Sequence, residues 1–280
     1  MRQVVQKAYF DAMQKATAYS GSLSKGDKVI SASSVFSDDL PLLLKIKHGV
    51  SNDWEYGPST IGSVFHIGAD IVFKEHSCSK RMSIPIVDGW TLSGEYDLLM
   101  EVDGVHCIVD HKLTKSTILK RLDKEGADHD YAKQLRTYKY LLTQTEPEKY
   151  NDDNVKGFIA MSFKDGSDFM KVKVPHFTMY ETDMSMTDDE MHKALVEKTK
   201  RLDMYLETNT LPSDCENKLW ARDGSTSKPM KCIKYCSVSD HCPWYKSYNK
   251  GQAYSKQKSE NNILKSMISR SRDKNKDIRI

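Results

Sequence analysis

Two aspartates stand out because the sequence places them on facing strands. Residues 90–113 alternate apolar and polar positions on both sides of Asp103-Gly104, a dipeptide typical of a two-residue turn between antiparallel strands. In the register that this turn sets, Asp97 lies directly opposite Asp110. Carboxylates that face each other across a strand pair repel unless something neutralises them. The pair therefore indicates a site for a hard divalent cation.

A lysine belongs to the same face of this predicted hairpin. Lys112 follows Asp110 by two residues, and the register places Glu95 opposite it, so one face gathers three acids and one lysine. A metal site with a neighbouring cation is one interpretation. The other is a solvated sheet face with ordinary ion pairs, Glu95 to Lys112 among them, and hairpin geometry alone leaves both open.

Helix patterns on either side of the hairpin supply further polar side chains. Gln134 and Tyr138 are four residues apart in a helix predicted over 131–142, so they share one face. His66 lies beside the apolar stripe of a helical pattern that begins at residue 61. Each of these residues is equally compatible with an ordinary place on or under a helix surface.

Four of the six cysteines crowd together near the C-terminal end. Cys215, Cys232, Cys236 and Cys242 have the spacing C-x₁₆-C-x₃-C-x₅-C, whereas Cys78 and Cys107 are isolated. Four thiolates held this closely suit a tetrahedral Zn²⁺ or a [4Fe–4S] cluster. Unconnected buried cysteines are the third possibility.

The elements that must position these residues belong to a chain of 280 residues with 39% hydrophobic and 29% charged residues. Such a chain can bury a sizeable core. It contains no apolar run of about 18 residues and no apolar signal-peptide segment near its start, so we expect a cytoplasmic protein without membrane spans. Further patterns predict helices over 3–17 and 187–207, strands over 155–163 and 169–175, and a basic connector over 114–130.

Short motifs in a fixed order resemble those of the PD-(D/E)XK nuclease superfamily, specifically its RecB-like exonuclease branch, which includes CRISPR-associated and phage-encoded members. The motifs are ISAS at Ile30–Ser33, GSVFH with His66, GEYDLL with Asp97, IVDHK with Asp110 and Lys112, and QLRTY with Gln134 and Tyr138. The resemblance spans about residues 28–245.

The resemblance implies an α/β fold with a restriction-endonuclease-like core, in which helices flank a central mixed sheet. It implies that Mg²⁺ or Mn²⁺ is bound by His66, Asp97, Asp110 and the backbone carbonyl of His111. Lys112 would orient the attacking water and offset charge on the phosphate. Gln134 and Tyr138 would support the site and the DNA backbone.

The C-terminal cysteines depart from the family's pattern. Many RecB-like nucleases carry an iron–sulfur cluster on one N-terminal cysteine and three C-terminal ones spaced C-x₂-C-x₅-C. Here no cysteine precedes Cys78 and the first C-terminal gap is x₃, so Cys215 would have to be the fourth ligand. A [4Fe–4S] cluster and Zn²⁺ both stay open, and either would fasten this C-terminal segment onto the core.

Taken together, these patterns predict a metal-dependent DNA nuclease, acting as an exonuclease on single strands or duplex ends in recombination, repair or phage DNA processing. A nucleic-acid-binding module of the same fold that does not cleave is the alternative. No P-loop is present, so a helicase or recombination protein would have to unwind DNA for it. The predicted parts are a helical N-terminal region (1–60), the nuclease core (61–210), the cysteine segment (211–245) and a tail (246–280).

The tail is the basic part of the chain. Residues 243–280 carry a net charge of +7 while the whole chain carries +3, so the rest is net acidic. Lysines without apolar neighbours bind phosphates irrespective of base sequence. We expect DNA contacts from Lys246, Lys250, Lys256 and Lys258, with a solvated tail as the alternative.

Overall fold

The fold is taken from a computed structural model of the chain. The structure describes residues 24–49, 66–165, 177–213, 215, 232, 233 and 236–249. It divides into two compact units, Met1–Leu211 and Pro212–Ile280. The predicted helix over 3–17 and strand over 169–175 lie outside the described residues, as do Lys250, Lys256 and Lys258.

The hairpin predicted from Asp103-Gly104 is confirmed. Strands β3 (Trp90–Val102) and β4 (Val105–Thr114) pair antiparallel, from Val102 opposite Val105 to Leu98 opposite Val109. Both turn residues have positive φ, 51° for Asp103 and 78° for Gly104, as a tight turn matched to the strand twist requires. The register is therefore the predicted one, but the ladder ends at Leu98, one residue before Asp97.

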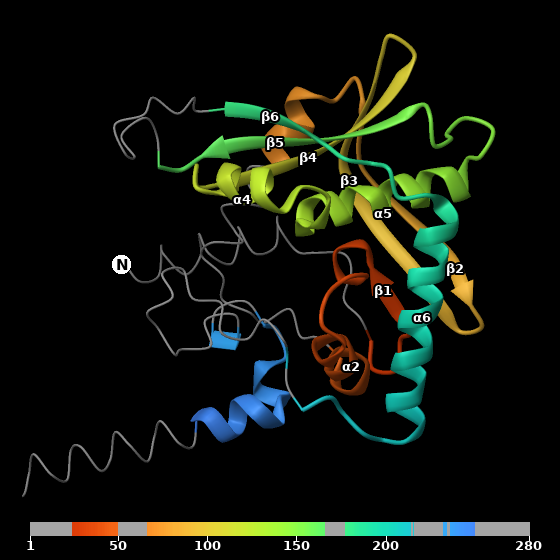
Figure 1. Ribbon diagram of the computed structural model, residues 1–280, viewed down its shortest axis with the longest axis vertical. Helices are drawn as coiled ribbons and strands as arrows, with labels where there is room; N and C mark the ends of the chain where they lie inside the picture. Colours follow the sequence, from red (N-terminus) through yellow and green to blue (C-terminus); the bar gives the residue numbers. More distant parts are fainter. Residues whose placement is uncertain are drawn as a thin grey trace, which may run out of the picture. The chain divides into compact units, whose positions relative to one another are not determined.

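A six-stranded mixed sheet is built around this hairpin (Figure 1). Parallel strand β1 (Val29–Ser31) and antiparallel strand β2 (Ser77–Val87) both pair with β3. On the other side of the hairpin, β4 pairs parallel with β5 (Val155–Phe163), which pairs antiparallel with the edge strand β6 (Phe177–Thr182). The predicted mixed sheet flanked by helices is confirmed.

The sheet forks within β3. Strand β2 pairs with β3 from Trp90 to Leu99, so β1 and β4 must share the opposite edge of β3. Strand β1 takes Thr91–Ser93 of that edge and β4 takes Leu98–Val102. Among the strands that the structure describes, none pairs with that edge at residues 94–97, which lie between β1 and β4, and Asp97 is the last residue of this opening.

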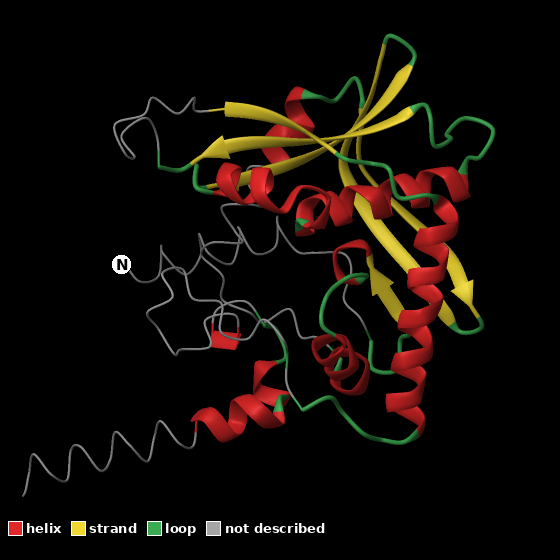
Figure 2. Ribbon diagram, in the orientation of Figure 1, coloured by secondary structure: helices red, strands yellow, loops and turns green. Residues whose placement is uncertain are grey.

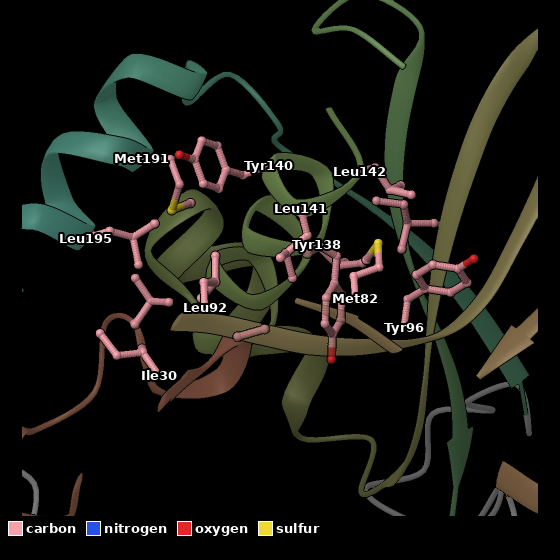
Figure 3. Packing of buried hydrophobic residues seen from close by; sticks show 14 of the residues in the cluster. Ile30, Met82, Leu92, Tyr96, Tyr138, Tyr140, Leu141, Leu142, Met191 and Leu195 are labelled. Carbon is pink, nitrogen blue, oxygen red and sulfur yellow. The ribbon is translucent and has the colours of Figure 1, made fainter. Parts of the chain in front are cut away.

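Helix α5 (Asp130–Thr145) packs on the sheet and carries much of the buried core (Figures 1 and 3). Its buried face includes Leu135, Tyr138, Leu141 and Leu142. Gly94 of β3 permits the close approach: a Cβ there would lie 2.7 Å from Cδ1 of Leu141 and 3.0 Å from Cε1 of Tyr138. The missing side chain thus sets how near Tyr138 lies to the sheet.

Two further helices, α2 and α6, belong to the first unit (Figure 2). Helix α2 (Asp39–His48) buries its leucines, and α6 (Asp188–Glu207) contributes Met191, Leu195 and Leu202 to the core. Helix α6 begins with the predicted capping box, in which Thr187 and Glu190 each bind the other's backbone N–H. The predicted helix over 187–207 is therefore confirmed.

Two elements differ from the sequence expectations. The sequence analysis did not predict β2, because its exposed polar residues and Pro85 hide the apolar alternation of Met82, Ile84 and Ile86. The expected connector over 114–130 contains helix α4 (Ile118–Glu125), which buries Ile118 and Leu122.

In the second unit, the described residues form a short 3-10 turn (Ser239–His241) and a helix over 243–249. Trp244 and Tyr248 of that helix stack with ring centroids 5.7 Å apart. Of the helices that the structure describes, none combines the length and apolarity that crossing a membrane requires.

Candidate active site

The fork in the sheet is what positions Asp97. The backbone N–H of His111 lies past the end of the β3–β4 ladder, and it donates to Oδ2 of Asp97 over 2.7 Å. The aspartate side chain thus takes the place that a strand carbonyl would have taken. Oδ1 of the same carboxylate lies 3.2 Å from Nδ1 of His66, which belongs to the described helical stretch 66–72.

These contacts keep Asp97 ionised. Burial alone would raise the pKa of Asp97, but the contact with His66 and the charge of Lys112 more than offset it, so the pKa lies below its ordinary value. The same contact with Asp97 raises the pKa of His66. His66 and Asp97 therefore form an ion pair that is favoured in the folded chain.

Asp110 is in a different state. It is 1% exposed, and burial raises its pKa to about 6, with the negative charge of Asp97 adding to the rise. Nζ of Lys112 lies 2.6 Å from its Oδ2, yet that buried oxygen accepts no hydrogen bond of regular geometry. Asp110 is thus a carboxylate whose need for a cation is only partly met.

Lys112 carries the positive charge of the site. Burial would lower the pKa of this lysine, but Asp110 and Asp97 outweigh burial and raise it. The lysine is therefore charged at neutral pH, with its side chain 20% exposed. Its ammonium also lies over the ring of Tyr131, 5.2 Å from the centroid. The sequence analysis missed Tyr131, although the residue stands three positions before Gln134 in the same helix.

The expected partner of Lys112 was wrong. Glu95 is bound instead by Arg81 of β2, with Nη2 2.7 Å from Oε2. Because β4 leaves β3 after Leu98, Glu95 faces β2 and not Lys112. The Glu95–Lys112 pair, which was the example of a sheet face with ordinary ion pairs, does not form; the ion pairs observed are Lys112 with Asp110 and Glu95 with Arg81.

The other predicted residues on α5 do lie together. Nε2 of Gln134 donates to the hydroxyl of Tyr138 over 2.6 Å, and Tyr138 packs beside Gly94, three residues before Asp97. His111 is buried, which lowers its pKa, and its ring centroid lies 6.4 Å from that of His66. The sheet and the two helices thus bring the hairpin, His66 and the α5 pair into one region of the first unit.

The chemistry of these donors fits a hard cation. Two carboxylates are close enough for the charge of each to act on the other, and the buried Oδ2 of Asp110 lies 2.6 Å from the Lys112 ammonium but accepts no hydrogen bond of regular geometry. A divalent ion would remove their repulsion and satisfy that oxygen. In the described part of the chain, however, no three His, Cys, Asp or Glu side chains converge as a ready metal site. Asp97 is engaged by His66 and by the His111 amide instead.

The cysteine segment is described at all four positions. Cys232 and Cys242 are buried, and Cys215 and Cys236 are half-buried. Among the described residues of this segment, no three potential metal ligands converge. Lys246 is exposed on the helix over 243–249.

Comparison with known proteins assigns the family. Residues 48–243 match the model of the PD-(D/E)XK nuclease superfamily, and this range includes the hairpin carboxylates, Lys112 and all four C-terminal cysteines. The chain therefore belongs to the PD-(D/E)XK nuclease superfamily. No curated protein sequence matches it.

Two solved structures are similar to this chain at low sequence identity. The crystal structure of SSO0001 is 14% identical with a TM-score of 0.50, covering 86% of this chain and 96% of that one. The alkaline exonuclease LHK-Exo from Laribacter hongkongensis is 12% identical with a TM-score of 0.41, covering 66% of this chain and 92% of that one.

Proposed function

We propose that the chain is a divalent-metal-dependent deoxyribonuclease of the RecB-like branch, acting as an exonuclease on single strands or duplex ends. The observation that carries the proposal is the pairing of Asp97 with a buried Asp110 whose pKa is raised to about 6, next to a charged lysine. Membership of the nuclease superfamily and the motif order support it. A fold that had lost cleavage would have no need to retain this costly arrangement.

His66, Asp97, Asp110 and the carbonyl of His111 would hold Mg²⁺ or Mn²⁺. When bound, the ion supplies a Lewis acid that polarises a phosphodiester oxygen. Occupation requires Asp110 to be ionised, and its raised pKa means that binding releases a proton below about pH 6.

Lys112 acts on the substrate side of this arrangement. A fixed ammonium stabilises the negative charge that develops on the phosphate during hydrolysis and orients the attacking water by hydrogen bonding. No described strand pairs with β3 at residues 94–97 on the Asp97 side, and Tyr138, hydrogen-bonded to Gln134, lies beside Gly94 of this stretch. We assign Gln134 and Tyr138 to support of the site and of the DNA backbone.

The experiment is a cleavage assay with DNA labelled at one end, in single-stranded and double-stranded form, with Mg²⁺, Mn²⁺ or chelator. We expect cleavage that needs metal and leaves a ladder or mononucleotides starting from one end. Equal cleavage in chelator would refute metal dependence. Products from internal sites of circular DNA would refute the exonuclease assignment while keeping the nuclease.

We also propose that the basic residues after the core contact DNA phosphates, starting from the exposed Lys246 and including Lys250, Lys256 and Lys258. Support comes from the net charge of +7 over residues 243–280. Replacing these four lysines by glutamine should weaken DNA binding and reduce the slope of log affinity against log salt by about 0.7–0.9 per contact. An unchanged slope would show that the tail is merely solvated.

For the cysteine segment we propose a structural metal, a [4Fe–4S] cluster or Zn²⁺, on Cys215, Cys232, Cys236 and Cys242. The proposal rests on their spacing alone. Anaerobic purification should yield a brown protein for the cluster, or a colourless protein with one zinc per chain. Cys215→Ser should lose the metal and Cys107→Ser should keep it. A metal-free wild-type protein would overturn the proposal.

A further inference from the structure

We propose that Tyr131 is a positioning residue for Lys112, and that it acts through the face of its ring. The inference rests on the proposed nuclease function and deepens it. Tyr131 would hold the lysine in place when the carboxylate of Asp110 binds a metal ion. Neither the motifs nor the family match assigns a role to Tyr131.

The ammonium of Lys112 makes two contacts. Its Nζ lies 2.6 Å from Oδ2 of Asp110 on one side and 5.2 Å from the ring centroid of Tyr131 on the other. An ammonium within about 6 Å of an aromatic face is attracted by the negative charge of that face. The lysine therefore has a second partner that is not a metal ligand.

Asp110 alone would not keep Lys112 in place while a metal ion is bound. Lysine carries its charge on a flexible stem, so its position depends on its contacts. If Asp110 were the sole partner, the ammonium would compete with a divalent ion for the same carboxylate oxygens. The ring gives the ammonium a place to stay when Asp110 is taken by the ion, next to the site and not on its ligands.

The start of helix α5 holds the ring of Tyr131 in place. Tyr131 stands in the first turn of α5, and its backbone N–H donates to Nδ1 of His129 over 3.1 Å. His129 is 2% exposed and caps the helix, and its ring centroid lies 4.7 Å from that of Tyr131. Its carbonyl also accepts from the N–H of Lys133. The ring is thus held by a buried helix start and not by a mobile loop.

The ring of Tyr131, and not its hydroxyl, makes the contact with Lys112. Burial raises the pKa of Tyr131, so the phenol is neutral at physiological pH. Its hydroxyl has no hydrogen-bond partner among the residues that the structure describes. The contact with Lys112 is made by the ring, which phenylalanine retains and leucine does not.

The test compares Tyr131→Phe and Tyr131→Leu in single-turnover cleavage at saturating Mg²⁺. We expect Tyr131→Leu to lower the rate constant about tenfold, the size of a partly desolvated cation–π contact, with little change in the DNA concentration for half-maximal rate. Tyr131→Phe should keep the wild-type rate. Tyr140→Leu is the matched control on the same helix, because Tyr140 is buried against His192 and makes no contact with Lys112.

A second readout does not depend on cleavage. In protein carrying ¹³C at lysine Cε, without metal, the Lys112 signal should be shifted upfield by the ring, with Lys112→Arg giving its assignment. The shift should persist in Tyr131→Phe and Tyr140→Leu and disappear in Tyr131→Leu.

The positioning role of Tyr131 and the proposed nuclease function can be refuted independently of each other. An unshifted Lys112 signal in the wild type overturns the positioning role, as does a Tyr131→Phe variant as slow as Tyr131→Leu, which would assign the role to the hydroxyl. A shifted signal in a wild-type protein that cleaves no DNA refutes the proposed function while leaving the contact established.

Discussion

Two lysine–aspartate pairs, each with one fully buried partner, shift the pKa of their aspartates in opposite directions. In the first, Lys198 of α6 donates to Asp39 of α2 over 2.9 Å and to the carbonyl of Ser37 over 2.7 Å. Arg201 donates to the other oxygen of Asp39 over 3.0 Å. Two cations thus serve one acid, and every oxygen of that acid is bound.

At the hairpin the buried acid has fewer partners. Asp110 contacts one cation, Lys112, whose charge also acts on Asp97, while Asp97 is paired with His66. Oδ2 of Asp110 is buried and accepts no hydrogen bond of regular geometry. Burial would raise the pKa of Asp39, but Arg201 and Lys198 hold it below its ordinary value. The pKa of Asp110 rises to about 6 instead. The same residue types therefore fasten two helices in one place and leave an unmet demand for a cation in the other.

The largest effect should come from removing the hairpin charges. Asp110→Ala and Lys112→Ala should each lower the cleavage rate at least about 1,000-fold, because each removes a fixed charge that acts on the reacting phosphate or its metal. Thermal melting in chelator should stay within a few degrees of wild type, or rise for Asp110→Ala. Wild-type cleavage by either variant would contradict the assignment of the site.

The helix pair should respond in the opposite way. Lys198→Ala should reduce the free energy of unfolding by about 3 kcal/mol, since it removes one partner of a buried pair. Its folded fraction should cleave DNA at the wild-type rate. Urea unfolding measures the loss, and the exposed Lys200→Ala on the same helix is the control. If Lys198→Ala impaired cleavage without destabilising the fold, the contrast between the two pairs would fail.

Asp110→Asn should reveal the unmet demand as a pH effect. A carboxyl group whose pKa is raised on folding stabilises the protein fully below its unfolded pKa near 3.8, and this contribution is lost as the pH rises to about 6. Without metal, Asp110→Asn should therefore gain stability over wild type as the pH rises from 4 to 6, on the order of 2 kcal/mol, and stay level above that. Melting curves at pH 4.5, 6.0 and 7.5 measure the gap. A gap that does not vary with pH would mean that Asp110 is not destabilised by ionisation.

Gly94→Ala should give the smallest effect of the four. The new Cβ would meet Leu141 at 2.7 Å and Ala32 and Tyr138 at 3.0 Å, so α5 has to move. We expect a loss of about 1 to 2 kcal/mol in stability and a modest loss of cleavage through displacement of Tyr138. Gly68→Ala is the control, because a Cβ there meets nothing within 4 Å. Full activity and stability of Gly94→Ala would show that the close approach is not needed.

The part of this arrangement that the sequence predicts is the part with local causes. Asp103-Gly104 determines the turn and hence the register, and Thr187 with Glu190 determines the start of α6. These features depend on residues a few positions apart, so they can be recognised without knowledge of the rest of the chain.

The fork has no such local cause. The fork arises because β1 occupies part of the edge of β3 that β4 also uses, while β4 continues along β5. A long stretch of sequence separates β1 from β3, and another separates β4 from β5. For that reason the sequence analysis placed Glu95 opposite Lys112 and could not anticipate the bond from the His111 amide to Asp97. Tyr131 was missed for a similar reason: its contact with Lys112 joins the start of α5 to β4 across the fold.

The most direct test of the central claim is metal binding itself. Titration of Mn²⁺ into the metal-free protein, followed by electron paramagnetic resonance of the free ion, requires no assumption about the substrate. The account predicts that wild type and Lys198→Ala bind Mn²⁺ alike, and that Asp97→Asn and Asp110→Asn lose the binding. Wild-type affinity in both asparagine variants would contradict the proposed metal site, because Asp97 and Asp110 would then not be the residues that bind Mn²⁺.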